Sequence, residues 1–205
     1  ISYAPSLAVL SILRSRESRD YPGGLLAVGD PAYASGEWAR LPGTADEVNA
    51  ITELFSDSNT LALTGESASE DKIVALDWRN FGVLHFACHG NWSATGGVEP
   101  SLVLATADSS SIGDGYLTLS EISAKPQQSR VVVLSACNSG LSAVDRPGSG
   151  VSSLARAFLL AGADAVVVSL WSVSDVATAY SMVETYAQMR SRHSEPAEAL
   201  RATQS

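Results

Sequence analysis

The sequence predicts an α/β fold in which helices cover both faces of a mostly parallel central sheet that carries a small β-hairpin insertion. Short apolar runs typical of buried strands recur along the chain, at residues 25–28, 59–63, 83–88, 131–134 and 165–170. Segments with apolar residues at helical spacing separate most of these runs, and clusters of glycine, proline, aspartate and serine mark turns. Strands that alternate with helices form parallel sheets with both faces buried.

The first strand and the first helix follow from their flanking residues. Residues 25–28 lie between Gly23-Gly24 and Gly29-Asp30-Pro31, which indicate turns on both sides. Apolar residues recur at helical spacing over residues 45–55 and predict a helix there. We expect Thr44 to be its N-cap and Glu47, three residues later, to complete a capping box.

The later elements are predicted in the same way. A helix from about residue 69 follows the second strand, and a helix over residues 151–161 ends at Gly162, a suitable C-cap residue. Two more helices are expected over residues 175–190 and 197–202, the last one after Pro196. Residues 101–105 and 116–119 flank a stretch rich in aspartate, serine and glycine, which predicts a surface hairpin or two edge strands.

Composition limits the class of protein. The 205 residues suit a single domain, and 45% of them are hydrophobic while 17% are charged, which excludes a disordered chain. The formal net charge of −9 argues against a nucleic-acid-binding protein, which needs a basic surface. No apolar run approaches the roughly 18 residues of a spanning helix, so we expect no membrane association. Because the chain starts at Ile1, we expect it to be part of a longer, multidomain protein.

Cysteine usage indicates the compartment. Cys88 and Cys137 are the two cysteines, and neither has a partner at zinc-ligand spacing. Two cysteines in a chain of this length do not suggest a disulfide framework. An intracellular, reducing setting is therefore expected, with a cytoplasmic location and no cofactor or metal.

Two strand ends carry the chemistry. The run from Val83 ends at His89-Gly90, and the run from Val131 ends at Cys137, followed by Asn138-Ser139-Gly140. Ligands and reactive groups gather at the carboxyl ends of parallel strands, so we expect the imidazole and the thiol at one edge of the sheet. A nearby imidazole activates a thiol as a nucleophile. The backbone N–H groups of Gly90 and Cys137 would then form an oxyanion hole.

Neighbouring polar residues have simpler explanations. His85 lies inside its strand and is expected to be a core histidine, and Cys88 should point to the face opposite His89 and be buried. His193 lies among charged residues and is expected to be solvated. A redox sensor built from Cys88 and Cys137 is an alternative that requires the two sulfur atoms to be close together.

Motifs along nearly the whole chain resemble the CHAT domain, a caspase-like family in the group that includes caspases, separase and legumain. The central ones are His85-Phe86-Ala87-Cys88-His89-Gly90 and Leu134-Ser135-Ala136-Cys137-Asn138-Ser139-Gly140. Further matching stretches lie at residues 1–6, 41–48, 114–118, 157–163, 169–178 and 194–201. The resemblance implies a caspase-like α/β/α sandwich with His89 as the catalytic histidine and Cys137 as the nucleophile. His89 precedes Cys137 by 48 residues, close to the spacing of about 50 in caspases.

The resemblance also implies which residues line the substrate pocket. Ser135, two residues before the nucleophile, is expected to line the primary pocket, with Trp171 as a pocket wall and Asp175 as an acidic residue that would favour lysine or arginine. The chain departs from the family at Gly148-Ser149-Gly150 and at residues 171–175, where the family has Gly-Glu-Gly and Trp-Pro-Val-Asp-Asp. The family's last strand is also missing by Ser205, so we expect residues 1–205 to be a CHAT domain that lacks this strand.

Taken together, the sequence predicts a cysteine endopeptidase that cleaves a protein or peptide substrate with a His89–Cys137 dyad. The resemblance implies regulation by fused or partner domains, such as TPR-like repeats or signalling domains, in a defence or cell-death pathway. The alternative is a catalytically silent scaffold with a caspase-like fold. The presence of both His89 and Cys137 argues against it, because a scaffold needs neither.

Overall fold

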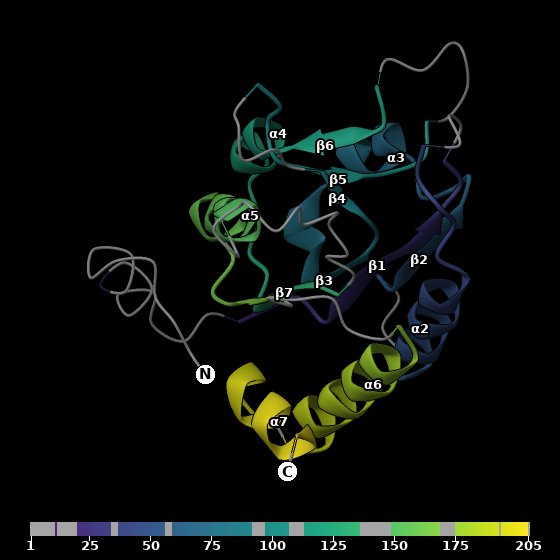
Figure 1. Ribbon diagram of the computed structural model, residues 1–205. Helices are drawn as coiled ribbons and strands as arrows, with labels where there is room; N and C mark the ends of the chain where they lie inside the picture. Colours follow the sequence, from purple (N-terminus) through teal and green to yellow (C-terminus); the bar gives the residue numbers. More distant parts are fainter. Residues whose placement is uncertain are drawn as a thin grey trace.

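A five-stranded parallel sheet forms the centre of the protein (Figure 1). The structure, a computed structural model, describes residues 11, 20–33, 37–55, 59–91, 97–106, 113–135, 149–168, 175–192 and 194–204, without the side chains of residues 149–152, 175–177 and 192. The strands follow the order β2-β1-β3-β7-β8, and all neighbouring pairs are parallel. Their bounds are β1 Gly24–Pro31, β2 Leu61–Gly65, β3 Phe81–Ala87, β7 Val131–Leu134 and β8 Val166–Val168.

The strand that leads to His89 lies beside the strand that leads to Cys137. In the β3–β7 pairing, Val83 is opposite Val131 and Phe86 is opposite Leu134. The amide of Ser135 extends the pairing by donating to the carbonyl of Phe86 at 2.8 Å. The two strands are therefore direct neighbours, and both run toward the same edge of the sheet.

Helices cover both faces of the sheet, which confirms the expected α/β/α architecture (Figure 1). The alternating side chains of β3 and β7 supply two apolar clusters, one with Leu84 and Phe86 and the other with Val83 and Val133. One face packs against α2 Pro42–Glu53, α6 Asp175–Arg192 and α7 Pro196–Thr203. The other packs against α3 Glu70–Ala75, the 3-10 helix η1 Trp78–Asn80, α4 Leu119–Ala124 and α5 Ser149–Ala161.

The expected hairpin is present and has a third strand. β5 Ser101–Val103 and β6 Tyr116–Thr118 pair antiparallel, and β4 Gly90–Asn91 pairs with β5 on its other edge. β4 begins directly after His89, so the small sheet is attached to the carboxyl end of β3. It lies on the α3–α5 side of the central sheet (Figure 1).

The capping box expected at Thr44 and Glu47 is wrong. Helix α2 begins at Pro42, whose fixed φ suits the first helical turn, and Leu41 is its N-cap residue without a side-chain cap. The Thr44 hydroxyl instead donates to the Leu41 carbonyl at 2.8 Å and accepts from the Asp30 amide at 2.8 Å. Glu47 is 2% exposed and points into the protein, where it contacts the carboxyl end of β7.

A capping box does occur at α4, a helix that the sequence analysis missed. The Thr118 hydroxyl accepts from the Glu121 amide at 3.3 Å, and a Glu121 carboxylate oxygen accepts from the Thr118 amide at 2.8 Å. The Thr-x-x-Glu pattern was the available signal. It was overlooked because the helix spans only six residues and follows a strand directly.

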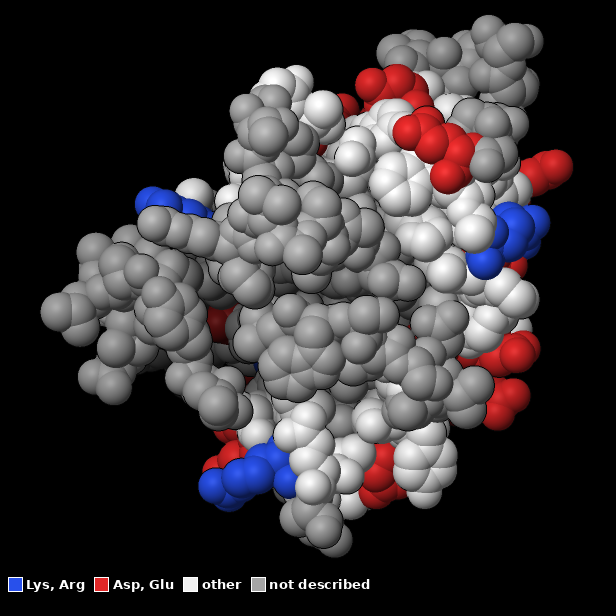
Figure 2. All heavy atoms as spheres, viewed as in Figure 1, with Lys and Arg blue, Asp and Glu red and all other residues white. Residues whose placement is uncertain are grey.

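The described surface reflects the acidic composition. Acidic side chains lie at the top, right and bottom of the face in Figure 2, while basic side chains form a few small groups. Within the described part of the chain, no helix combines the length and the apolar character needed to cross a membrane.

Candidate active site

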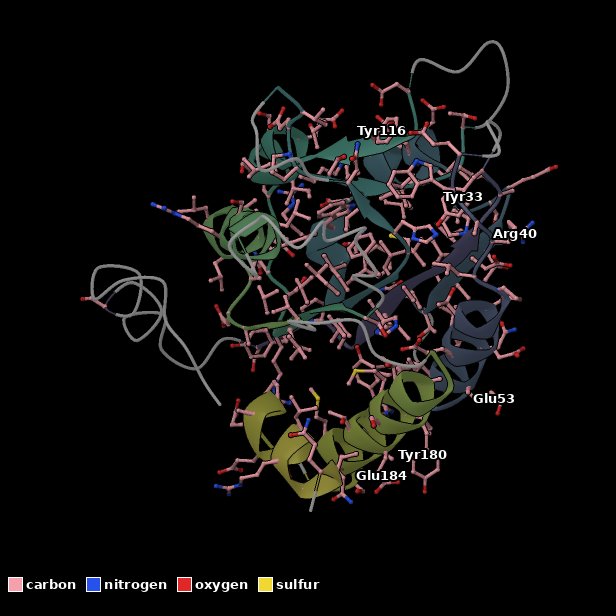
Figure 3. The ribbon with its side chains drawn as sticks, viewed as in Figure 1. Tyr33, Arg40, Glu53, Tyr116, Tyr180 and Glu184 are labelled. Carbon is pink, nitrogen blue, oxygen red and sulfur yellow. The ribbon has the colours of Figure 1, made fainter. Side chains whose placement is uncertain are left out.

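His89 lies at the carboxyl edge of the central sheet, between the end of β3 and the start of β4. It is 7% exposed. Its ring lies close to Tyr33 and Trp38, whose ring centroids are 5.4 and 5.2 Å away. Trp38 makes a long hydrogen bond of 3.4 Å from its indole nitrogen to the Tyr116 hydroxyl on β6, and Figure 3 shows Tyr33 and Tyr116 on this side of the molecule. These aromatic rings shield the imidazole from water.

The two ring nitrogens of His89 have different surroundings. Nε2 is 2.8 Å from the carbonyl oxygen of Ala39. Because a carbonyl only accepts hydrogen bonds, Nε2 carries the proton in the neutral ring and Nδ1 has the lone pair. Nδ1 is buried and has no hydrogen-bond partner among the described residues. This tautomer presents a basic nitrogen at the edge of the sheet.

The segment that supplies the Ala39 carbonyl is held by Asp30 at the end of β1. Arg40 Nε and Nη2 donate to the two Asp30 carboxylate oxygens at 2.8 and 2.5 Å, and the Leu41 amide donates to Oδ1 at 2.8 Å. Burial on its own would raise the pKa of Asp30, but the hydrogen bonds from Arg40 and Leu41 outweigh it and lower the pKa. The carboxylate is therefore charged at neutral pH.

The backbone N–H of Gly90, next to His89, points away from the neighbouring strand β5. Gly90 is opposite Leu102 in the β4–β5 pairing, and the Val103 amide donates to the His89 carbonyl at 2.8 Å. In an antiparallel ladder this bond makes Gly90 and Leu102 a non-hydrogen-bonded pair. The ladder therefore does not use the Gly90 N–H, which can approach a ligand closely because glycine has no Cβ.

A buried polar network lies behind the neighbouring strand end. Ser135 is 3% exposed, and its hydroxyl donates to Glu47 Oε1 at 2.6 Å. The same oxygen is 3.2 Å from His85 Nε2, an ion-pair distance without the alignment of a hydrogen bond. His85 Nδ1 is 3.1 Å from the Tyr186 hydroxyl on α6. Burial raises the pKa of Tyr186, and the nearby Glu47 carboxylate raises it further, so this hydroxyl stays protonated.

This network accounts for two of the predicted core residues. His85 is fully buried and packs edge-on against Tyr186, which confirms that it is a core histidine. Cys88 is 2% exposed and belongs to the apolar cluster on the α3–α5 face, which confirms its burial. Among the described residues, no group of histidine, cysteine, aspartate and glutamate side chains could hold a metal ion.

The other predicted site residues are only partly described. Cys137, the predicted nucleophile, and Trp171, the predicted pocket wall, lie outside the described residues, as does His193. Asp175 is the first residue of α6, and its side chain is also outside them. Ser135 directly follows β7, and its hydroxyl faces Glu47. The role of Ser135 in substrate binding stays a prediction.

The groups that hold His89 could not be identified from the sequence. The acceptor of its Nε2–H is a backbone carbonyl, which leaves no side-chain signal in a sequence. Asp30 was interpreted as part of a turn, although its place directly after a buried strand was a usable signal. Tyr33, Trp38 and Arg40 lay in a segment interpreted as a loop.

Comparison with known proteins identifies the family. The family model described as the CHAT domain matches residues 1–205, the whole chain. A search of curated proteins finds no match.

Proposed function

The chain belongs to the CHAT domain family, which is caspase-like and peptidase-related, and on that premise we propose that it is a cysteine endopeptidase with His89 as the base and Cys137 as the nucleophile. The observation that carries the proposal is the state of His89. Its Nε2 is engaged by the Ala39 carbonyl, and its buried Nδ1 has no partner within the described part of the chain. A buried polar atom in this state calls for an explanation, and a thiol partner supplies one.

The register of the sheet supports this pairing. Phe86 and Leu134 are opposite each other in adjacent parallel strands. His89 follows Phe86 by three residues, and Cys137 follows Leu134 by three residues. Two residues at equal steps beyond paired positions are suited to act together at one edge of a sheet.

The proposed reaction uses Nδ1 of His89 twice. Nδ1 takes the proton of the Cys137 thiol, and the sulfur then bonds to the scissile carbonyl carbon. Nδ1–H gives this proton to the leaving amine as the C–N bond breaks, which leaves a thioester. A water molecule then gives a proton to Nδ1 and its oxygen bonds to the thioester carbonyl carbon. The C–S bond breaks, the acid product is released, and Nδ1–H returns the proton to the sulfur of Cys137.

Backbone amides would stabilise the oxyanion of this reaction. The N–H of Gly90 is not used by the β4–β5 ladder and directly follows His89. With the N–H of Cys137 it would form the oxyanion hole, in which one donor lowers the activation barrier by about 3–4 kcal/mol. Gly90 would act through its backbone N–H only, and the absence of a Cβ would let the substrate carbonyl come close to this N–H.

For the substrate, we propose a protein or peptide with lysine or arginine before the cleaved bond. Ser135, Trp171 and Asp175 would line the pocket for this residue. The Ser135 hydroxyl donates to Glu47 Oε1 at 2.6 Å, which fixes the side chain of Ser135 at this position. Regulation by fused or partner domains of TPR-like or signalling type, within a cytoplasmic defence or cell-death pathway, is part of the same proposal and follows from the family alone.

A fluorogenic peptide screen tests the proposal. The peptides vary the residue before the scissile bond, and a thiol-reactive peptide probe reports labelling of Cys137 by mass spectrometry. We expect cleavage and probe labelling in the wild type, a preference for lysine or arginine, and no cleavage by Cys137→Ala. Equal turnover by Cys137→Ala would remove Cys137 from the mechanism. No probe labelling at Cys137 would favour the alternative, a catalytically silent scaffold.

A further inference from the structure

Asp30 adopts an unusual backbone conformation at the end of β1. Its φ of 43° lies in the left-handed region, and no other non-glycine residue in the described part of the chain has a positive φ. Such conformations are unfavourable for most residues and persist where the surroundings enforce them, often near functional sites. Asp30 is also 6% exposed, so its carboxylate is nearly removed from water.

Contacts from both the side chain and the backbone of Asp30 hold this conformation. Its carboxylate accepts three hydrogen bonds, two from the Arg40 guanidinium and one from the Leu41 amide. Its own amide donates to the Thr44 hydroxyl, which in turn donates to the Leu41 carbonyl. Asp30 therefore binds the segment before α2 at two consecutive residues and at the first helical turn.

Close packing between β1 and α2 leaves this segment little freedom. A Cβ atom on Gly29, the residue before Asp30, would lie 2.5 Å from the Thr44 carbonyl oxygen. The end of β1 and the start of α2 therefore touch through their backbones. Ala39 lies directly before the two residues that Asp30 binds, and its carbonyl is the acceptor for His89 Nε2.

We propose that Asp30 is a positioning residue that keeps the Ala39 carbonyl against His89 Nε2 and thereby holds the imidazole in the tautomer with a basic Nδ1. The proposal rests on the proposed function, because a basic Nδ1 matters only if His89 activates a thiol. The Asp30 carboxylate binds Arg40 and Leu41, and these two residues fix the position of the Ala39 carbonyl directly before them. Asp30 itself does not touch the reacting atoms.

The protein contains a second aspartate–arginine pair that serves as a control. Asp77 accepts from the Arg79 amide at 3.1 Å, from Nε at 2.9 Å and from Nη2 at 2.8 Å, the same kinds of donor that Asp30 receives. This pair lies at the start of η1, before β3, whereas His89 follows the other end of β3. The side chain of Asp77 is 44% exposed, compared with 9% for Asp30.

The kinetic test compares Asp30→Asn with Asp77→Asn. Asparagine keeps the size of aspartate and tolerates a positive φ, but it has one acceptor oxygen where three donors converge. We expect kcat for a fluorogenic peptide to fall about 10-fold in Asp30→Asn, because displacement of a catalytic group by about 1 Å can slow a reaction up to about 100-fold. KM should stay within about 2-fold, and Asp77→Asn should match the wild type in both constants.

A spectroscopic test reports on the tautomer without any peptide. Long-range ¹H–¹⁵N correlation spectra distinguish the two neutral tautomers of histidine, and the His89 signals are assigned by their loss in His89→Gln. We expect the Nε2–H tautomer in the wild type and in Asp77→Asn, and a mixture of the two tautomers in Asp30→Asn. If the wild type cleaves no peptide, the proposed function fails, while this measurement still decides whether Asp30 controls His89.

The two measurements must agree for the proposal to stand. Wild-type kcat in Asp30→Asn would overturn it, and so would a lower kcat with an unchanged His89 tautomer, which would mean a purely structural role. If Asp30→Asn does not fold, Arg40→Gln replaces it, because the Arg40 side chain is 53% exposed and can be changed without opening the core. We expect Arg40→Gln to shift the tautomer in the same direction, and a wild-type spectrum would overturn the proposal.

Discussion

His85 and His89 lie four residues apart on one segment and have opposite surroundings. His85 is fully buried between α2 and α6, with Nδ1 3.1 Å from the Tyr186 hydroxyl and Nε2 3.2 Å from the Glu47 carboxylate. His89 lies at the edge of the sheet, with Nε2 on the Ala39 carbonyl and Nδ1 without a partner among the described residues. One imidazole contacts protein groups with both nitrogens, and the other does so with one nitrogen among the described residues.

These different surroundings predict different roles for the two histidines. A ring held at both nitrogens cannot exchange a proton with a nucleophile unless a buried contact is broken. A ring held at one nitrogen has a defined tautomer and a basic atom on the other side. We therefore expect substitutions at His89 to reduce activity and substitutions at His85 to reduce stability.

The largest effect is expected for His89→Ala. Loss of the general base should lower kcat/KM for peptide cleavage by about 10²–10⁴-fold. Thermal unfolding followed by circular dichroism serves as the control for folding. A variant that folds and keeps at least one tenth of the wild-type kcat/KM would mean that His89 is not the base.

His85→Gln should act mainly on stability. It removes the imidazole that lies 3.1 Å from the buried Tyr186 hydroxyl and 3.2 Å from the Glu47 carboxylate, and a buried polar group left without its partner costs about 1–3 kcal/mol. Urea denaturation measures the free energy of unfolding. An unchanged midpoint, or a loss of activity as large as that of His89→Ala, would contradict the contrast between the two histidines.

Ser135→Ala links the two regions, because Ser135 contacts the Glu47 of the His85 network and precedes Cys137 by two residues. Loss of its hydrogen bond should lower the free energy of unfolding by about 1–2 kcal/mol. The matched control is Ser129→Ala, since Ser129 is also buried and its hydroxyl bonds to the Phe81 carbonyl and to Gln127 at the other end of β7. Only Ser135→Ala should change the ratio of kcat/KM between lysine and alanine peptides. Equal ratios in both variants would remove Ser135 from the pocket.

The smallest effect is a contribution of Asp30 to stability at acid pH. The folded-state pKa of Asp30 is lowered, so its contribution is fully present above the unfolded value of about 3.9 and is lost as pH falls through the folded value. Urea denaturation of the wild type between pH 6 and pH 2 should therefore show a loss of stability that Asp30→Asn lacks. Parallel pH curves for the two proteins would show that the Asp30–Arg40 pair makes no net contribution.

The strands that lead to His89 and Cys137 could be predicted from the sequence, because they depend on apolar pattern and on the residues at the strand ends. The runs before His89 and Cys137 are mostly apolar, and the second begins with three valines, so the strands and their shared edge could be predicted from residues 83–90 and 131–137. Their direct pairing does not follow from the runs alone, because a strand order is not encoded in apolar pattern; the register of Phe86 with Leu134 shows it.

The groups that hold the site could not be predicted in the same way. The position of Glu47, three residues after Thr44, suggested a capping residue. A glutamate near the start of a helix can equally face the core when a buried polar group is there to bind it. The buried hydroxyl of Ser135 is that group. The Ala39 carbonyl is invisible to residue-type reasoning, since every residue has one.

Activation of Cys137 by His89 should be visible in the rate of Cys137 alkylation as a function of pH. Iodoacetamide labelling followed by mass spectrometry separates Cys137 from the buried Cys88. An imidazolium beside the thiolate should lower the pKa of Cys137 well below the usual value of about 8.5, and His89→Ala should return it to about 8.5. Identical pH–rate profiles for the wild type and His89→Ala would contradict the account.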